Sequence, residues 1–152
     1  MPVVEESVEI QRSVGDVFDF LIDPHNLAVW ESSVVEAHQI DDAPAVVGTR
    51  SAGVNKVLGV RFEWVSEINE LERPQRVAWS ASSSGDKFRF TVAYDVVPAG
   101  AGALVTYRVE AEPGLGGVFG RFTDALVVGA QRRTMRSSLD NLAAIMSAPS
   151  AG

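Results

Sequence analysis

Residues 88–96 read FRFTVAYDV, and this stretch has the clearest periodicity in the chain. Its large apolar residues occupy every second position, from Phe88 through Tyr94 to Val96, with smaller or polar residues between them. Because successive side chains of a β-strand point to opposite faces, this period of two predicts a strand with one apolar face and one face in water. Turn-forming residues flank it at 83–86 (SSGD) and 98–102 (PAGAG), so we expect the neighbouring strands to run antiparallel.

Similar alternation extends outward from this stretch in both directions. The further candidate strands are residues 4–10, 34–40, 48–54, 60–68, 77–81 and 103–109. Short turns separate most of them, which favours antiparallel neighbours over parallel strands joined by crossover helices. The sequence therefore predicts an antiparallel sheet of about seven strands, one face of which is apolar and must be covered.

Helical patterns precede and follow this run of strands. Ser13 is a suitable N-cap for a helix over 14–21, and Pro24 suits the first turn of a second short helix. Residues 118–146 predict one long C-terminal helix. Its apolar stripe is Phe122, Ala125, Val128, Met135, Leu139, Leu142 and Met146. We expect one α+β domain over residues 1–152, with the sheet wrapped around the long helix.

Residues 23–30 read DPHNLAVW, which resembles the D-P-x-N-x-x-x-W segment of the polyketide cyclase/dehydrase and START-like superfamily. The order of elements, with Gly48-Thr49-Arg50 and Glu72-Arg73-Pro74, is similar to that family over nearly the whole chain. The resemblance implies the helix-grip (SRPBCC-type) fold and a cavity for a small hydrophobic ligand. The superfamily includes carriers, cyclases and hydrolases, so the resemblance implies no single activity.

Composition and charge exclude several classes of function. The formal net charge of −7 repels phosphate backbones, so nucleic acid is not an expected partner. The chain has no cysteine, which excludes disulfides and thiolate chemistry, and His25 and His38 lack metal-ligand spacing. We therefore predict neither a metal nor a cofactor. With no targeting sequence and no apolar run long enough to cross a bilayer, we expect a cytoplasmic protein without integral membrane association.

Aromatic side chains on the apolar face are the candidate ligand-binding residues. Trp64, Trp79 and Tyr107 each combine a large ring with a polar atom, although such rings can equally well fill a core. Gly129 in the long helix suggests room for a ligand beside Arg132, unless this is simply a solvated face. The facing of Arg50 is left open. The predicted set is Trp30, Phe62, Trp64, Trp79, Phe90, Tyr107, Phe122 and Arg132.

No residue is predicted to be an essential catalyst. No inward position on the clear strands is acidic, so we expect the cavity to hold tyrosines, tryptophans and at most an arginine. The leading hypothesis is binding or transport of a small hydrophobic ligand, such as a lipid, a polyketide or a related metabolite. The alternative is a polyketide cyclase or dehydratase in which Arg50 or Arg132 polarises a carbonyl beside Tyr107. A protein-interaction module with an exposed apolar patch is a third class, and a homodimer is left open.

Overall fold

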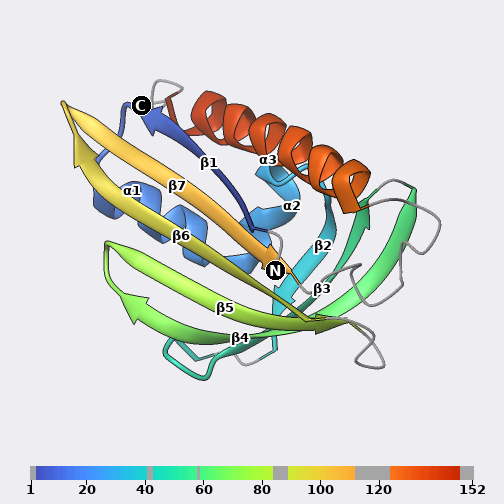
Figure 1. Ribbon diagram of the computed structural model, residues 1–152. Coiled ribbons are helices and arrows are strands. Elements are labelled where there is room, and N and C mark those ends of the chain that lie inside the picture. Colours follow the sequence, from blue (N-terminus) through green and yellow to red (C-terminus); the bar gives the residue numbers. More distant parts are fainter. Residues whose placement is uncertain (1–2, 41–42, 58, 84–88, 112–123, 148–152) are drawn as a thin grey trace.

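The computed structural model describes residues 3–40, 43–57, 59–83, 89–111 and 124–147. In these ranges seven strands form a single curled sheet, with short helical segments after the first strand and a long helix at the end (Figure 1). The elements are β1 (Val3–Ile10), α1 (Val14–Ile22), η1 (Pro24–Asn26), α2 (Leu27–Trp30), β2 (Val34–Gln39), β3 (Arg50–Val57), β4 (Val60–Glu72), β5 (Arg76–Ser83), β6 (Arg89–Ala99), β7 (Gly102–Ala111) and α3 (Asp124–Ser147).

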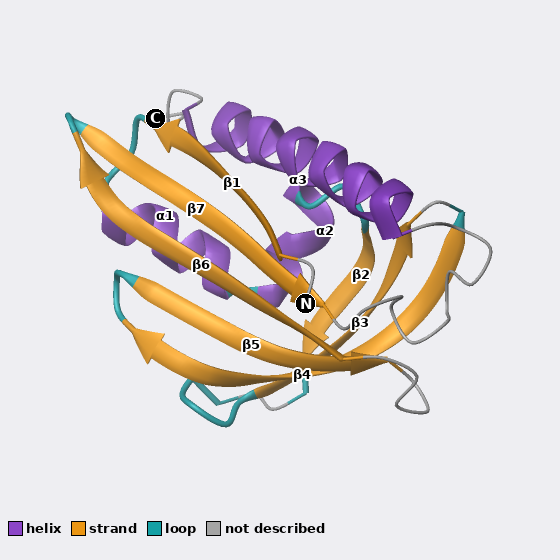
Figure 2. Ribbon diagram, viewed as in Figure 1, coloured by secondary structure: helices purple, strands orange, loops and turns teal. Residues whose placement is uncertain are grey.

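The sheet has the strand order β1-β7-β6-β5-β4-β3-β2, and every neighbouring pair is antiparallel. Figure 2 shows how strongly the sheet curls, with all the helices on its concave side. The predicted antiparallel sheet, the short helices after the first strand and the long C-terminal helix are confirmed. Residues 118–123, which we expected to begin the long helix, lie outside the described residues.

Local hydrogen bonds explain the turn that separates α1 from α2. The Ser13 hydroxyl accepts a hydrogen bond from the amide of Asp16 at 3.2 Å, which caps α1 as the sequence predicts. Asp23 ends α1 and caps the short η1 segment, in which Pro24 occupies the first position. Trp30, at the end of α2, is buried on the concave side of the sheet.

One stripe of α3 packs into the core. Met135, Leu139, Leu142 and Met146 are almost completely buried, at the helical spacing that the sequence predicts. The helix runs along β1 and also contacts α2 (Figure 1). Strands β4 and β5 lie at the far side of the curl from α3 (Figure 1). The helix therefore covers one side of the sheet, and the inward-facing side chains of the other strands line the space within the curl.

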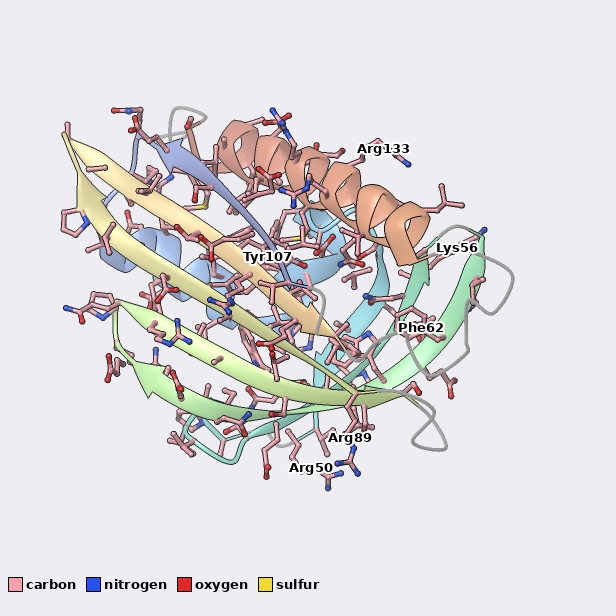
Figure 3. All side chains as sticks on the ribbon, in the orientation of Figure 1. Arg50, Lys56, Phe62, Arg89, Tyr107 and Arg133 are labelled. Carbon is pink, nitrogen blue, oxygen red and sulfur yellow. The ribbon has the colours of Figure 1, made fainter. Side chains whose placement is uncertain are left out.

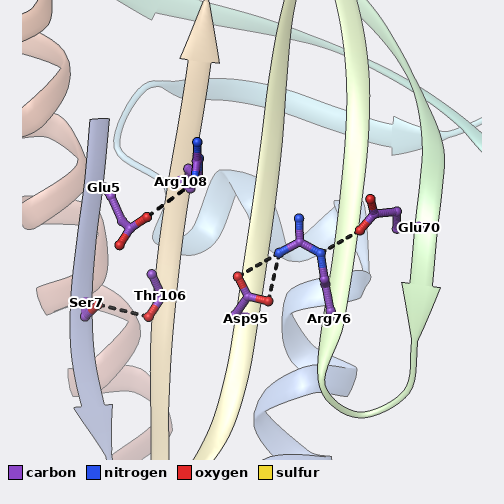
Figure 4. A network of polar contacts seen from close by, with 7 residues as sticks. All are labelled: Glu5, Ser7, Glu70, Arg76, Asp95, Thr106 and Arg108. Atoms are coloured by element: carbon purple, nitrogen blue, oxygen red, sulfur yellow. Dashed lines mark hydrogen bonds and ion pairs between the residues drawn. The ribbon is translucent and has the colours of Figure 1, made fainter. Parts of the chain in front are cut away.

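The convex face of the sheet is polar. Arg76 on β5 donates two hydrogen bonds of 2.8 Å to Asp95 on β6 and one of 2.6 Å to Glu70 on β4 (Figure 4). On the other side of this face, the hydroxyls of Ser7 and Thr106 join β1 to β7 at 3.0 Å. The strands thus place most of their charged side chains in water on the convex face and most of their large apolar side chains on the concave face.

Candidate ligand-binding site

A pocket of about 100 Å³ lies on the concave face of the sheet. Strands β3 to β7 form most of its wall, and residues of α1, η1, α2, the 31–33 segment and β2, with one residue of α3, complete it. The apolar lining residues are Leu21, Pro24, Leu27, Val34, Val57, Phe62, Trp64, Trp79, Ala81, Phe90, Val92, Tyr94, Tyr107, Val109 and Ala111; the polar ones are Glu31, Ser33, Ser51, Asn55, Ser66 and Gln131. A concave, mainly apolar wall with a few polar groups is typical of a small-molecule site.

Five of the predicted binding residues lie together in this wall, namely Phe62, Trp64, Trp79, Phe90 and Tyr107. The rings of Phe62 and Phe90 meet edge to face with centroids 6.5 Å apart, and Tyr107 meets Tyr94 in the same way at 5.1 Å. Figure 3 shows Phe62 and Tyr107 within the curl of the sheet. The aromatic residues of this wall therefore offer ring surfaces that a flat or apolar molecule can contact.

Trp64 is held in place from two sides. Its indole Nε1 donates a hydrogen bond to Asn55 on the neighbouring strand at 2.8 Å, so its polar atom is satisfied. Gly53, its partner in the β3–β4 ladder, lies against the indole ring. A Cβ atom at Gly53 would overlap that ring and lie 2.5 Å from the carbonyl oxygen of Glu36. The glycine thus makes the space that Trp64 occupies.

The remaining predicted residues lie elsewhere. Trp30 is buried in the core outside the pocket wall, where its ring packs edge to face on Tyr94 at 5.7 Å and on Tyr107 at 5.9 Å. Its Nε1 has no hydrogen-bond partner among the described residues. Trp30 therefore supports the two tyrosines from behind. Phe122 lies outside the described residues.

Arg50 and Arg132, the two arginines proposed from the sequence, do not line this pocket. Arg132 reaches from α3 across to β1 and forms an ion pair with Glu6 at 3.0 Å, and its side chain is about half exposed. Its neighbour Gln131 is the residue of α3 that lines the wall. Arg50 is exposed on the convex face, near Arg89 (Figure 3).

A buried carboxylate belongs to the pocket, contrary to our expectation that the cavity would contain none. Glu31 is 4% exposed and lies directly after α2. Its Oε1 accepts hydrogen bonds from the amide of Ser33 at 3.2 Å, from the hydroxyl of Ser33 at 3.1 Å and from the hydroxyl of Ser138 at 2.7 Å. Its Oε2 accepts a short hydrogen bond from the phenol of Tyr107. Four donors from the 31–33 segment, β7 and α3 therefore hold one carboxylate.

Strand alternation does not reveal the direction of Glu31, because this residue lies outside the strands, directly after α2. Glu31 lies in a bend, and its direction is determined by the short helix before it, whose Leu27 carbonyl accepts a hydrogen bond from the Glu31 amide at 2.8 Å. The available signal was its position immediately after the family-like segment that ends at Trp30.

The electrostatics of the pocket keep its tyrosines protonated. Burial raises the pKa of Tyr107 well above its ordinary value, and the charge of Glu31 and the hydrogen bond to it raise it further. The pKa of Tyr94 is also raised, first by burial and then by the charge of Glu31. Tyr107 is thus a neutral phenol whose proton is directed at the carboxylate.

Alkaline titration should show no tyrosine ionisation while the protein stays folded. The chain has two tyrosines, Tyr94 and Tyr107, and both have raised pKa values. The unfolded chain loses these protons near pH 10, so stability is fully present below about pH 10 and falls above it, by about 1.4 kcal/mol per pH unit for each tyrosine. Ultraviolet absorbance of tyrosinate, recorded with circular dichroism, measures this. Tyrosinate that forms while the dichroism is still native would contradict the buried network.

Two further structural findings concern other kinds of site. Within the described residues, no group of three or more His, Asp or Glu side chains is arranged to hold a metal ion. No helix in the described ranges is both long and apolar enough to span a bilayer.

Comparison with solved structures shows the same fold in several bacterial proteins. TTHA0849 from Thermus thermophilus is 21% identical, with a TM-score of 0.75 and coverage of 99% of this chain and 100% of that one. A conserved protein from Geobacillus kaustophilus is 14% identical, with a TM-score of 0.76 and coverage of 96% and 95%. DynU16, a protein of the dynemicin biosynthetic locus, is 17% identical with a TM-score of 0.67, and the match covers 96% of this chain and 47% of that one.

At the level of sequence, no curated protein matches this chain. The model of one protein family, described as polyketide cyclase/dehydrase and lipid transport, matches residues 1–147. This match spans the sheet, the pocket residues and the whole of α3. The chain therefore belongs to the polyketide cyclase/dehydrase and lipid transport family.

Proposed function

We propose that this protein binds a small, mainly apolar molecule in the pocket on the concave face of its sheet. The observation that carries the proposal is the pocket itself, about 100 Å³ with aromatic side chains from four strands, β4 to β7, in its wall. An apolar cavity of roughly 150 Å³ takes up benzene. The pocket of this protein, at about 100 Å³, therefore suits one aromatic ring or a short chain better than a whole lipid. The cytoplasm is the compartment that we propose for this binding.

The contacts in the wall support binding of an apolar ligand. Phe62, Phe90 and Trp79 are only partly buried, so their rings retain surface that a ligand can cover. Each 100 Å² of apolar surface removed from water contributes about 2.5 kcal/mol. The polar atom of Trp64 is already satisfied by Asn55, so the indole offers an apolar surface without an unmet hydrogen bond.

Filling the pocket should weaken binding. Ala81 lines it, and an Ala81→Phe variant is expected to lose at least tenfold in affinity for 4-propylphenol, about 1.4 kcal/mol, because the new ring occupies the ligand's space. Isothermal titration calorimetry measures both proteins. The matched control is Ser82→Phe, whose side chain belongs to the opposite face of β5 and should leave affinity unchanged. Equal affinity of Ala81→Phe and wild type, or no binding of apolar ligands to wild type, would contradict the proposal.

Acid–base catalysis of the polyketide cyclase or dehydratase type is a second candidate function. It is favoured by the hydrogen bond between Tyr107 and Glu31 in the pocket, because a phenol and a carboxylate in contact can pass a proton to or from a bound substrate. DynU16, which shares the fold, comes from a biosynthetic locus. Mass spectrometry of the ligand separates the two functions: a binder returns its ligand unchanged, and an enzyme releases a product.

A further inference from the structure

The pocket contains one acidic side chain and no basic one among the described residues that line it. Glu31 is the acid, and the other lining residues that carry a hydroxyl or amide group are serines, an asparagine, a glutamine and the two tyrosines. The two arginines predicted to act beside Tyr107 lie elsewhere: Arg132 pairs with Glu6, and Arg50 is exposed on the convex face. No described lining residue therefore offers a positive charge to a ligand.

The hydrogen bonds at Glu31 leave two unused hydrogen-bond acceptors beside it, one on Oε2 of Glu31 and one on the Tyr107 oxygen. Among the described residues, Oε1 accepts from three donors and Oε2 from Tyr107 alone. A carboxylate has about four acceptor positions over its two oxygens, so Oε2 can accept a second hydrogen bond. The Tyr107 hydroxyl has committed its proton to Glu31, and its oxygen can still accept one. A ligand group that donates a hydrogen bond is complementary to both atoms.

An anionic ligand meets the opposite situation. Its charge would be removed from water and placed near the carboxylate of Glu31, with no described cation in the wall to compensate. Burying a charge without a partner is unfavourable, and a like charge close by in a region of low dielectric adds repulsion. The two tyrosines are neutral phenols, because burial and the charge of Glu31 raise the pKa of both, so they supply no positive charge, and Tyr107 already donates its proton to Glu31.

We propose that this pocket selects neutral apolar ligands that carry a hydrogen-bond donor, such as a phenol or an alcohol, and rejects carboxylates. This inference rests on the proposed function, since it names the class of ligand for the same pocket. The apolar body lies against the aromatic wall, and the donor group hydrogen-bonds to Oε2 of Glu31 or to the Tyr107 oxygen. Free fatty acids and other apolar carboxylates are thereby excluded as ligands.

Three ligands of matched shape test the proposal on the wild-type protein by calorimetry. 4-Propylphenol is a neutral donor, propylbenzene has no polar group, and 4-propylbenzoate is an anion at neutral pH. We expect 4-propylphenol to bind at least tenfold more tightly than propylbenzene, because it gains a hydrogen bond to a charged acceptor. We expect 4-propylbenzoate to bind at least tenfold more weakly than 4-propylphenol.

A neutral variant assigns this ranking to Glu31. In Glu31→Gln, the advantage of 4-propylphenol over propylbenzene should fall below about threefold and the rejection of 4-propylbenzoate should weaken at least tenfold. Propylbenzene affinity should stay within about threefold of wild type, which shows that the pocket is intact. Glu67→Gln makes the same change of net charge on the exposed convex face and should leave all ratios unchanged.

The outcomes separate this inference from the proposed function. If the three ligands bind wild type equally, or the benzoate binds best, the inference is wrong and the pocket is still a binding site. If none of the three binds, the proposed function fails and the inference fails with it. The ranking of the three ligands on the wild-type protein tests the inference even if Glu31→Gln does not fold.

Discussion

Replacing Leu139 with alanine is expected to lower the free energy of unfolding by about 3 kcal/mol. Leu139 is 2% exposed and lies in the middle of the buried stripe of α3, within the core cluster that includes residues of β1, α1 and β7. Truncating a buried leucine removes its transfer free energy and leaves a cavity, which together cost roughly 2–5 kcal/mol. Urea denaturation followed by circular dichroism gives the value.

A matched control comes from the same helix. Ile145 is 37% exposed on the outer side of α3, so Ile145→Ala should cost less than about 1 kcal/mol. Similar costs for the two variants would mean that α3 does not grip the sheet through its predicted stripe. The comparison of the two variants therefore tests whether α3 packs on the core through this buried stripe.

Replacing Gly53 with alanine is expected to destabilise the protein by a similar amount, about 3 kcal/mol, and to disturb the pocket. The added Cβ would overlap the indole of Trp64 and lie 2.5 Å from the carbonyl oxygen of Glu36 on β2. A backbone carbonyl cannot rotate away, so either the β2–β3 pairing or the Trp64 ring has to move. Denaturation measures the stability, and tryptophan fluorescence reports a displaced indole.

Gly129→Ala is the control for this variant, because it makes the same chemical change at a site with space. A Cβ at Gly129 would meet its nearest neighbour, the Arg133 guanidinium, at 3.7 Å. The residue lies inside α3, where alanine is favoured over glycine by roughly 0.5–1 kcal/mol, so this variant should be more stable than wild type. Equal effects of the two variants would contradict the view that Gly53 makes room for Trp64. Gly129 is not among the described residues that line the pocket. The space beside this glycine is therefore not part of the proposed binding site.

Alternation along the strands predicted most of the aromatic wall. A residue on a strand faces one of two directions, so the pattern around Phe62, Trp64 and Phe90 is sufficient to place them on the concave face. Alternation cannot distinguish core residues from pocket residues, because it does not show which inward-facing side chains the helices cover. Tyr94 is deep in the core and also reaches the pocket, which only the packed structure shows.

Helices and bends are where sequence reasoning was weaker. Successive helix residues point about 100° apart, so Gln131 lines the pocket while Arg132 turns towards Glu6 on β1. The rotation of α3 follows from its packing along β1, which no local pattern encodes. Glu31 is a stronger case: a bend has no periodicity, and an acidic residue there is normally expected in water. Its burial depends on Ser138 and Tyr107, each more than 70 residues away in the chain.

The most direct test of ligand binding in this pocket is the structure of the protein with 4-propylphenol bound. We predict that the ring lies against Trp64, Phe90 and Trp79, with its hydroxyl at about 3 Å from Oε2 of Glu31 or from the Tyr107 oxygen. A ligand found on the convex face, or a concave face that remains without ligand at a saturating concentration, would contradict the proposed function.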